Sequence, residues 1–359
     1  MIGIHSISTC YNYGALLQCW SLQQAIKGLV NVPVVHVEIT SNSPLLTAKG
    51  FVKKLLKRTA SESLTVAKRK EAANAFKFCC LPSVSLTKWD DVMQTKLTGL
   101  IVGSDEVLRP SLHTTDVMRG ILPASLSIPV SGYAMSSGRD DSLQIMEGRF
   151  NAYGFRDVGI RDTASAKLFK TAGRTATLTL DPVFLPASNQ FFALNAAAAV
   201  GESFIPEEPY TLIYSDKSPS ELMSICSSLD IQGKIVVLGN VGHSVISEKW
   251  TNQYTVLEPS FPIHAIPALF ASASSVITNF FHGVVFALRN EKPFYFLKNE
   301  MKAYKVLDLL TQLDALFFDS LSLASEQEWR EFYNSVTPRI IAKRKSSLDY
   351  LEQALGEMV

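Results

Sequence analysis

Short apolar runs alternate along the chain with longer segments in which apolar residues recur at helical spacing. In the first half, the pattern predicts strands at residues 2–8, 34–39, 99–102, 128–135, 158–160 and 176–180, and helices at residues 15–26 and 165–171. Strands that alternate with helices in this way are typical of parallel α/β layers.

The same rhythm restarts after Asp181 and the polar stretch at residues 187–209. It predicts strands at residues 210–214, 234–238, 254–256, 275–278 and 294–296, and helices at residues 220–229, 263–272 and 283–290. The restart indicates two doubly wound, Rossmann-like domains that face each other across a cleft. We expect an N-terminal domain at residues 1–185 and a C-terminal domain at residues 186–359, whose last helix can pack back on the first domain.

Composition narrows the class of protein. The chain has 359 residues, of which 47% are hydrophobic and 19% charged, enough for two ordinary cores. The 34 Lys and Arg residues balance 33 Asp and Glu residues, which argues against a nucleic-acid partner. No apolar run approaches the roughly 18 residues of a membrane span. The five cysteines show no CxxC spacing, which favours a reducing, cytoplasmic location without structural zinc.

Two turns in the N-terminal domain carry candidate ligand-binding residues, because ligands of such sheets lie beyond the carboxyl ends of the strands. The first turn brings Asn12, Tyr13 and Gly14 to the start of a helix, where unpaired N–H groups suit a phosphate or carboxylate. The alternative is an ordinary strand-to-helix turn. In the second turn Ser104 and Asp105 follow a buried strand. They either face a ligand or cap a helical turn.

Arg161 and His282 follow two further strands. The guanidinium of Arg161 is a planar fork that suits carboxylate or phosphate, and the alternative is a local ion pair with Asp162 or another acid. His282 stands at the end of an apolar strand, before Gly283 and a helix. It is either a tunable proton donor at an anion site or a core histidine that bonds a backbone carbonyl.

Taken together, these turns resemble the polysaccharide pyruvyl transferase family. The matching segments occur in the family's order and spacing: NYGALLQCWSLQQAI at residues 12–26, LIVGSDEV at 100–107, GYAMSSG at 132–138, VGIRDTASAKLF at 158–169, LDPVFL at 180–185 and SSVITNFFHGVVFALRNEKPF at 274–294.

The resemblance implies two Rossmann-like domains in a GT-B-like arrangement. It also implies transfer of pyruvate from phosphoenolpyruvate to two hydroxyls of a sugar, which forms a cyclic ketal and releases phosphate. Arg161 matches the family's arginine that contacts phosphoenolpyruvate, and His282 matches its candidate catalytic histidine. Lys302 falls where some members have a functional lysine, and Ser136 and Gly283 complete the expected substrate-binding set.

Three departures from the family pattern concern the donor and acceptor sites. Glu106 and Leu108 stand where many members have Gln and Trp, and Phe280 stands where some have an arginine. Lys302 or Arg289 is a candidate for the missing positive charge.

The expected chemistry uses His282 as the general acid that delivers a proton to phosphoenolpyruvate. Arg161 stabilises the carboxylate and the departing phosphate, and Asp105 is a weaker candidate for the base on the sugar hydroxyl. No cofactor or metal is expected, because the chain has no HExxH motif or convincing carboxylate cluster. Two alternatives stay open: a nucleotide-sugar glycosyltransferase of the same architecture, and a catalytically inactive sugar-binding relative.

The resemblance also implies the partners. The acceptor is expected in a bacterial-type exopolysaccharide, capsule or cell-wall precursor, with a lipid-linked oligosaccharide as one form, and a homo-oligomer is an open alternative. Residues 50–78 carry many Lys and Arg residues beside apolar ones, which is typical of a basic amphipathic helix on the inner surface of a membrane. The alternative is a solvated helix over the N-terminal domain.

Overall fold

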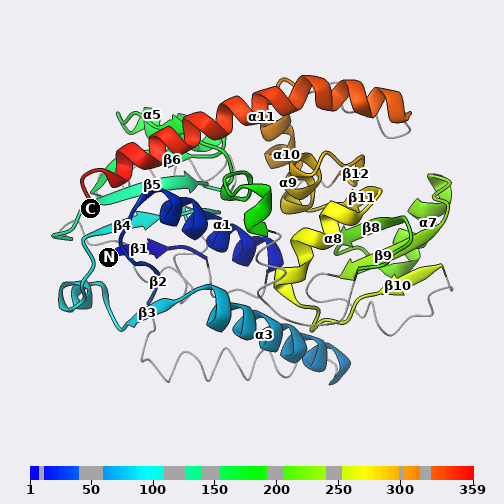
Figure 1. Ribbon diagram of the computed structural model, residues 1–359, viewed down its shortest axis with the longest axis horizontal. Coiled ribbons are helices and arrows are strands. Elements are labelled where there is room, and N and C mark those ends of the chain that lie inside the picture. The colour runs from blue at the N-terminus through cyan, green and yellow to red at the C-terminus, as the bar shows by residue number, and fades with distance from the viewer. Residues whose placement is uncertain are drawn as a thin grey trace.

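The computed structural model describes residues 1–7, 12–39, 60–108, 126–138, 154–191, 205–239, 253–298, 303–315 and 325–359, with only the backbone for residues 60–63. In these residues two parallel sheets lie side by side, each with helices packed on it (Figure 1). The prediction of two Rossmann-like α/β layers is confirmed.

The first sheet has the order β3-β2-β1-β4-β5-β6-β7, and every pairing in it is parallel. Its strands are β1 (Ile2–His5), β2 (Val34–Ile39), β3 (Ser83–Leu86), β4 (Gly99–Val102), β5 (Val130–Met135), β6 (Phe155–Ile160) and β7 (Thr177–Leu178). The helical elements that precede or follow these strands are α1 (Tyr13–Leu29), η1 (Trp89–Gln94), α5 (Thr163–Thr171) and η4 (Pro182–Phe184).

The second sheet has the order β10-β9-β8-β11-β12 and is also parallel throughout. Its strands are β8 (Tyr210–Ser215), β9 (Lys234–Gly239), β10 (Tyr254–Val256), β11 (Ser275–Thr278) and β12 (Phe294–Phe296). Its helices are α7 (Pro219–Ser228), η5 (Ile263–Ala265), α8 (Ile266–Ser272), α9 (Phe281–Arg289) and α10 (Ala303–Gln312).

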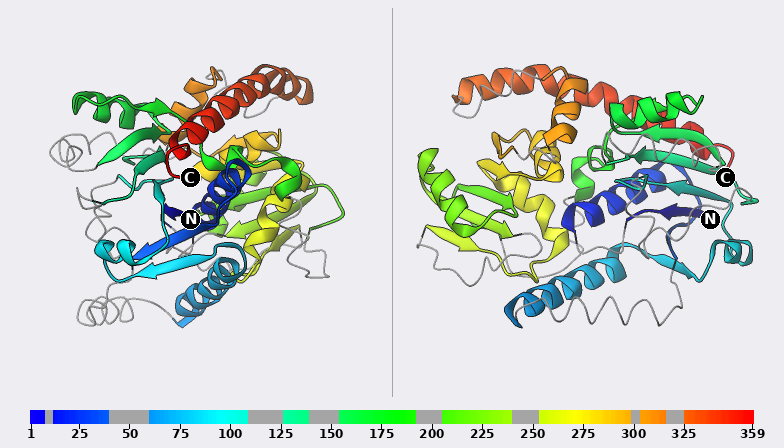
Figure 2. Two further views of the ribbon diagram at one scale, coloured as in Figure 1. Left: turned by 60° about the vertical axis from the view of Figure 1, so that its left-hand side comes forward. Right: turned by 180° about the vertical axis from the view of Figure 1, so that it is seen from behind.

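Two long helices connect the sheets along opposite edges of the molecule (Figures 1 and 2). Helix α11 (Glu326–Leu355) packs Trp329 against Phe294 near the second sheet, while Leu351 belongs to the cluster that covers β1. Helix α3 (Ala60–Cys80) donates a hydrogen bond from Arg69 to the carbonyl of Gly239, at the end of β9. The division of the chain at residues 185 and 186 stays a prediction.

The largest apolar cluster joins the two halves of the chain. It contains Leu16, Leu17 and Trp20 from α1 together with Val284 and Phe286 from α9. Because burial of apolar surface contributes roughly 25 cal/mol per Å², this shared core holds α1 and α9 firmly against each other. Their first turns therefore meet between the sheets.

Three local features differ from the sequence-based expectation. Strand β3 was not predicted, because SVSL lacks a run of bulky apolar residues. Helix α9 begins at Phe281, so His282 lies in its first turn and not at the end of a strand. Within the described residues, which reach Leu108 here, no helix follows Ser104 and Asp105. Asp105 adopts φ 76° and forms a bridge with Met135.

Candidate active site

The first turns of α1 and α9 are shaped by a few short contacts. Asn12 caps α1 by accepting hydrogen bonds from the backbone N–H groups of Gly14 and Ala15. The hydroxyl of Thr278 donates to the carbonyl of Tyr214 at 2.6 Å and accepts from the N–H of Phe280 at 3.1 Å. This bond fixes the turn between β11 and α9.

Glycines allow the two helices to approach closely. A Cβ on Gly14 would lie only 2.3 Å from Nδ1 of His282, so the imidazole rests directly on the backbone of α1. A Cβ on Gly283 would lie 2.1 Å from the hydroxyl of Thr278. Gly14 and Gly283, both predicted to bind substrate, are thus required by packing against neighbouring side chains. At Gly14 the side chain that approaches closely is that of His282.

Five polar side chains form one network where the helices meet. Arg161 binds Asp181 through Nη1 and Asp105 through Nη2, each at 2.8 Å. Oε1 of Gln18 lies 3.3 Å from Nη1 of Arg161 and 3.1 Å from Nε2 of His282. The same Nε2 lies 3.7 Å from a carboxylate oxygen of Asp181. The network therefore joins His282 of α9 to residues of the N-terminal half.

Local backbone structure orients Arg161 and Asp181 in this network. Arg161 directly follows β6, and Asp162 caps α5 by accepting from the N–H of Ser165 at 2.8 Å. Asp181 accepts from the N–H of Val183 at 3.1 Å, which aims its second oxygen at the guanidinium. The guanidinium also lies over the ring of Phe281, 4.8 Å from its centroid.

Burial and charge set the protonation of the network. Burial lowers the pKa of His282, and Asp181 and Asp105 only partly oppose it, so the imidazole is neutral near pH 7. For Asp105, burial alone would raise the pKa, but Arg161 and His282 outweigh it and the pKa is lowered. Burial also opposes the charge of Arg161, but its two carboxylate partners raise its pKa above the ordinary value.

Helix α10 covers the network from the C-terminal half. Lys305 forms an ion pair with Glu106, beside Asp105. Gln312 donates to the carbonyl of Arg161 at 2.9 Å, and Asp308 accepts from the N–H of Thr163 at the start of α5. Burial lowers the pKa of Lys305. In this part of the described structure, ion pairs join the carboxylates of Asp105, Asp181 and Glu106 to the cations of Arg161 and Lys305.

Comparison with protein-family models assigns the chain to a family. The sequence model of the family described as polysaccharide pyruvyl transferase matches residues 12–300, a span that includes all five residues of the network. The chain belongs to this family. It is a pyruvyltransferase enzyme. No curated protein matches it in sequence.

Solved structures are similar to the enzyme in fold. The UDP-GlcNAc 2-epimerase from Neisseria meningitidis, bound to UDP-GlcNAc, superposes with a TM-score of 0.54 at 9% identity, over 98% of each chain. The glycosyltransferase SnogD from Streptomyces nogalater gives a TM-score of 0.48 at 14% identity, over 99% of this chain and 97% of its own. The first likeness agrees with the GT-B-like pair of Rossmann-like domains.

The remaining predicted site residues of the pyruvyltransferase lie outside the network. Asn12 uses its side chain as the cap of α1, and the hydroxyl of Tyr13 donates to the carbonyl of Pro259 at 3.3 Å. The hydroxyl of Ser136 accepts from the N–H of Gly138. The buried hydroxyl of Ser104 has no partner within the described residues. Lys302 lies outside the residues that the structure describes.

Sequence reasoning assigned no role to three residues that the structure brings to the site. Gln18 and Asp181 stand inside two of the segments that carried the family resemblance, but a glutamine in an apolar helix and an aspartate before a proline also suit ordinary structural roles. Lys305 lies three residues after Lys302, the lysine that the resemblance implied. Gln18 is fully buried in α1, but so is Gln23, so a glutamine within the apolar pattern of this helix does not by itself identify a site residue.

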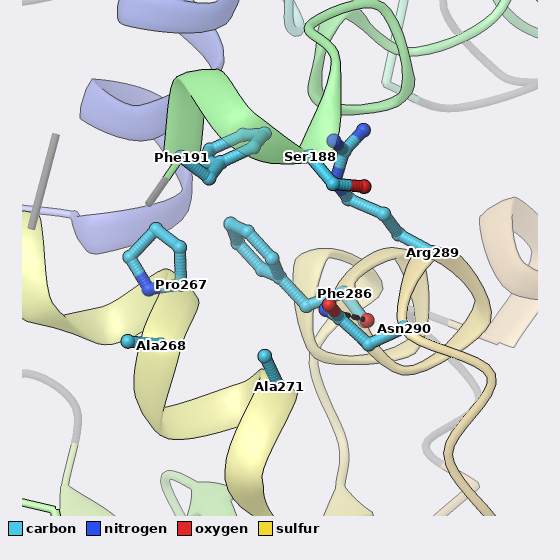
Figure 3. Close-up of a pocket in the computed structure, with 8 residues that line it drawn as sticks. All are labelled: Ser188, Phe191, Pro267, Ala268, Ala271, Phe286, Arg289 and Asn290. Atoms are coloured by element: carbon cyan, nitrogen blue, oxygen red, sulfur yellow. Dashed lines mark hydrogen bonds between the residues drawn. The ribbon is translucent and has the colours of Figure 1, made fainter. Parts of the chain in front are cut away.

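Arg289 does not supply the charge missing at Phe280. It donates to the carbonyls of Val183 and Pro186, each at 2.7 Å, and lies over the ring of Phe191, 4.4 Å from its centroid. Figure 3 shows it at the edge of a separate pocket between α8, α9 and the segment after η4. The residues that line this pocket are Ser188, Phe191, Pro267, Ala268, Ala271, Phe286, Arg289 and Asn290.

The described part of the basic stretch contacts the protein itself. Lys68 pairs with Glu258 at 2.8 Å, Arg69 is buried, and Lys77 pairs with Glu38 at 2.5 Å. The basic residues before position 60 lie outside the description. Among the described helices, none has the length and apolar character needed to cross a bilayer. Within the same residues no group of three or more His, Cys, Asp or Glu side chains is placed to hold a metal ion.

Proposed function

We propose that the enzyme transfers pyruvate from phosphoenolpyruvate to two hydroxyls of one sugar. The products are a cyclic pyruvate ketal and phosphate. The observation that carries the proposal is the position of His282, a neutral, buried imidazole that the helix contact between the two halves holds beside Arg161, Asp105 and Asp181.

The proposed reaction begins with the transfer of a proton from His282 to C3 of phosphoenolpyruvate. C2 then acquires oxocarbenium character and accepts the oxygen of the first sugar hydroxyl. Phosphate leaves from C2, and the second hydroxyl closes the ring on the same carbon. One hydroxyl proton replaces the proton given to C3, and the other leaves with phosphate. A general acid of this kind contributes about 10²–10⁴ in rate.

Charge at the site favours donor binding that is coupled to proton uptake. The described carboxylates of Asp105, Asp181 and Glu106 outnumber the cations of Arg161 and Lys305. A donor with a carboxylate and a phosphate therefore needs additional positive charge close to it. Protonation of His282 supplies that charge and also prepares it as the general acid. Lys302 is proposed as a further cation.

Asp105 is proposed to assist the acceptor. Its lowered pKa keeps it ionised at neutral pH, so it can accept a hydrogen bond from a sugar hydroxyl. We propose that the acceptor belongs to a bacterial-type exopolysaccharide, capsule or cell-wall precursor on the cytoplasmic side of a membrane, with lipid-linked oligosaccharides as candidates. No cofactor is proposed, because phosphoenolpyruvate itself supplies the transferred group.

The test is incubation of the enzyme with phosphoenolpyruvate and a panel of glycosides. We expect phosphate release that depends on the acceptor, together with an acceptor mass gain of one pyruvate ketal. Parallel reactions with nucleotide sugars serve as the comparison. Glycosyl transfer from these donors would replace the proposal by a glycosyltransferase activity, and tight glycoside binding without either reaction would indicate an inactive sugar-binding relative.

A further inference from the structure

Gln18 makes the two contacts that decide how the imidazole of His282 is protonated. It is fully buried in α1, and its Oε1 lies within hydrogen-bonding distance of both Arg161 and His282. An arginine can only donate hydrogen bonds. The atom of the Gln18 amide that faces Nη1 of Arg161 must therefore be the oxygen.

The orientation of this amide fixes a proton on Nε2 of His282. Both polar neighbours of Nε2 are acceptors: Oε1 of Gln18 at 3.1 Å and a carboxylate oxygen of Asp181 at 3.7 Å. A lone pair on Nε2 would face two oxygen atoms, whereas an N–H satisfies them. In a neutral ring only one nitrogen carries a proton, so Nδ1 keeps the lone pair.

Nδ1 lies where it can serve a ligand. It rests over Gly14 in the first turn of α1 and forms no hydrogen bond with any of the residues that the structure describes. The amide Nε2 of Gln18 is likewise buried without a partner in the described structure. Nδ1 is thus the ring nitrogen of His282 that the described residues leave without a hydrogen-bond partner.

We infer that Gln18 is a positioning residue. It keeps Nε2 of His282 protonated and hydrogen-bonded to the protein, so that Nδ1 is the atom that exchanges a proton with the substrate. This inference rests on the proposed function for its substrate, but the tautomer does not depend on any substrate. When the donor binds, Nδ1 takes up a proton from solvent, gives it to C3 of phosphoenolpyruvate and then receives one from the incoming hydroxyl. Nε2 keeps its proton throughout the reaction.

The test compares Gln18→Met, which removes the amide, with Gln18→Glu, which keeps an acceptor oxygen. Gln23→Met is the matched control, because Gln23 is also fully buried in α1 and, among the described residues, its side chain bonds only the carbonyl of Val34. Two-bond ¹H–¹⁵N spectra of ¹⁵N-histidine-labelled protein report the tautomer of His282, whose signals are assigned with His282→Gln. Turnover with phosphoenolpyruvate and an accepted glycoside gives kcat and KM.

We expect His282 in the Nε2–H form in the wild type, in Gln18→Glu and in Gln23→Met, and a loss of this preference in Gln18→Met. We also expect Gln18→Met to lower kcat by about 10- to 100-fold, with the KM for phosphoenolpyruvate changed less than about threefold. A wild-type protein protonated on Nδ1, or an unchanged tautomer and kcat in Gln18→Met, would overturn the inference. The Nε2–H form without turnover of phosphoenolpyruvate would refute the proposed reaction alone.

Discussion

Adding one methyl group at Gly14 should displace the ring of His282 without unfolding the protein, which tests the catalytic role of the ring apart from its packing. In Gly14→Ala the new Cβ would lie 2.3 Å from Nδ1, 2.4 Å from Cγ and 2.8 Å from Cβ of His282, whereas ordinary contacts lie at 3.4–4 Å. Nδ1 and Cγ fall short of an ordinary contact by about 1 Å and Cβ of His282 by about 0.6 Å. The imidazole, together with the first turn of α9 that carries it, must therefore retreat by up to about 1 Å.

A displacement of this size is large for proton transfer and modest for folding. Misplacement of a reacting group by about 1 Å can cost on the order of 10²-fold in rate. Overpacking a buried site costs about 1–3 kcal/mol of folding stability, and the better helix propensity of alanine offsets part of it, by at most about 1 kcal/mol. We therefore expect kcat to fall about 100-fold while the protein still folds.

Gly28→Ala is the matched control, because Gly28 lies in the same helix and a Cβ there would meet no described atom within 4 Å outside the helix's own backbone. We expect wild-type turnover and a melting temperature at or above that of the wild type. The assay measures phosphate release from phosphoenolpyruvate with an accepted glycoside, next to thermal unfolding of all three proteins. Wild-type kcat in Gly14→Ala would show that the position of the His282 ring does not control the reaction.

Four further substitutions, one binding measurement and one unfolding measurement test the site and the fold. His282→Ala should keep the fold by circular dichroism but lose most pyruvyl transfer; retained turnover would restore the interpretation as a core histidine. Lys302→Ala and Lys305→Met should each raise the KM for phosphoenolpyruvate, by about tenfold if the lost contact is worth about 1.4 kcal/mol; unchanged kinetics would exclude that lysine from the donor site. Binding of phosphoenolpyruvate near pH 7 should take up protons, because the neutral His282 gains a negative neighbour; titration calorimetry in two buffers with different ionisation enthalpies measures this uptake, and equal enthalpies would contradict it. Burial, with help from Lys77 and Lys27, lowers the pKa of His36 from 6.5 to about 3, so its stabilising contribution is present above pH 6.5 and is lost as the pH falls towards 3. Urea unfolding should show about 2 kcal/mol less stability at pH 5 than at pH 7 from this residue, and His36→Met should remove that difference.

Periodicity predicted the sheets better than it predicted the exact start of α9. Strands such as β8 and β11 are buried on both faces and read as apolar runs, so their positions follow directly from the sequence. The start of α9 depends on one hydroxyl, because Thr278 holds the N–H of Phe280 and allows the helix to begin at Phe281. Such a contact has no periodic signal.

The partners within the network could not be predicted from the sequence alone. Arg161 and His282 could be named from their turns, but their partner Gln18 lies 143 and 264 residues away from them along the chain. The sequence left two interpretations of Arg161, a ligand contact or an ion pair. The structure places it between Asp105 and Asp181, two acids from different turns, while the nearby Asp162 caps α5.

Helix α11 has a consequence for recombination between relatives. Its early turns pack on aromatic residues of the second sheet, and its late turns pack on the first sheet, where the hydroxyl of Tyr350 donates to the carbonyl of Gly132 at 2.7 Å. A chimera that exchanges everything after the first sheet would therefore place a foreign α11 on the native β1 and β5. Exchanging residues 205–298 alone would keep the contacts of α11 with the first sheet, so that α11 would meet foreign residues only at its early turns. Of these two designs, the chimera that exchanges only residues 205–298 should give a folded protein more often.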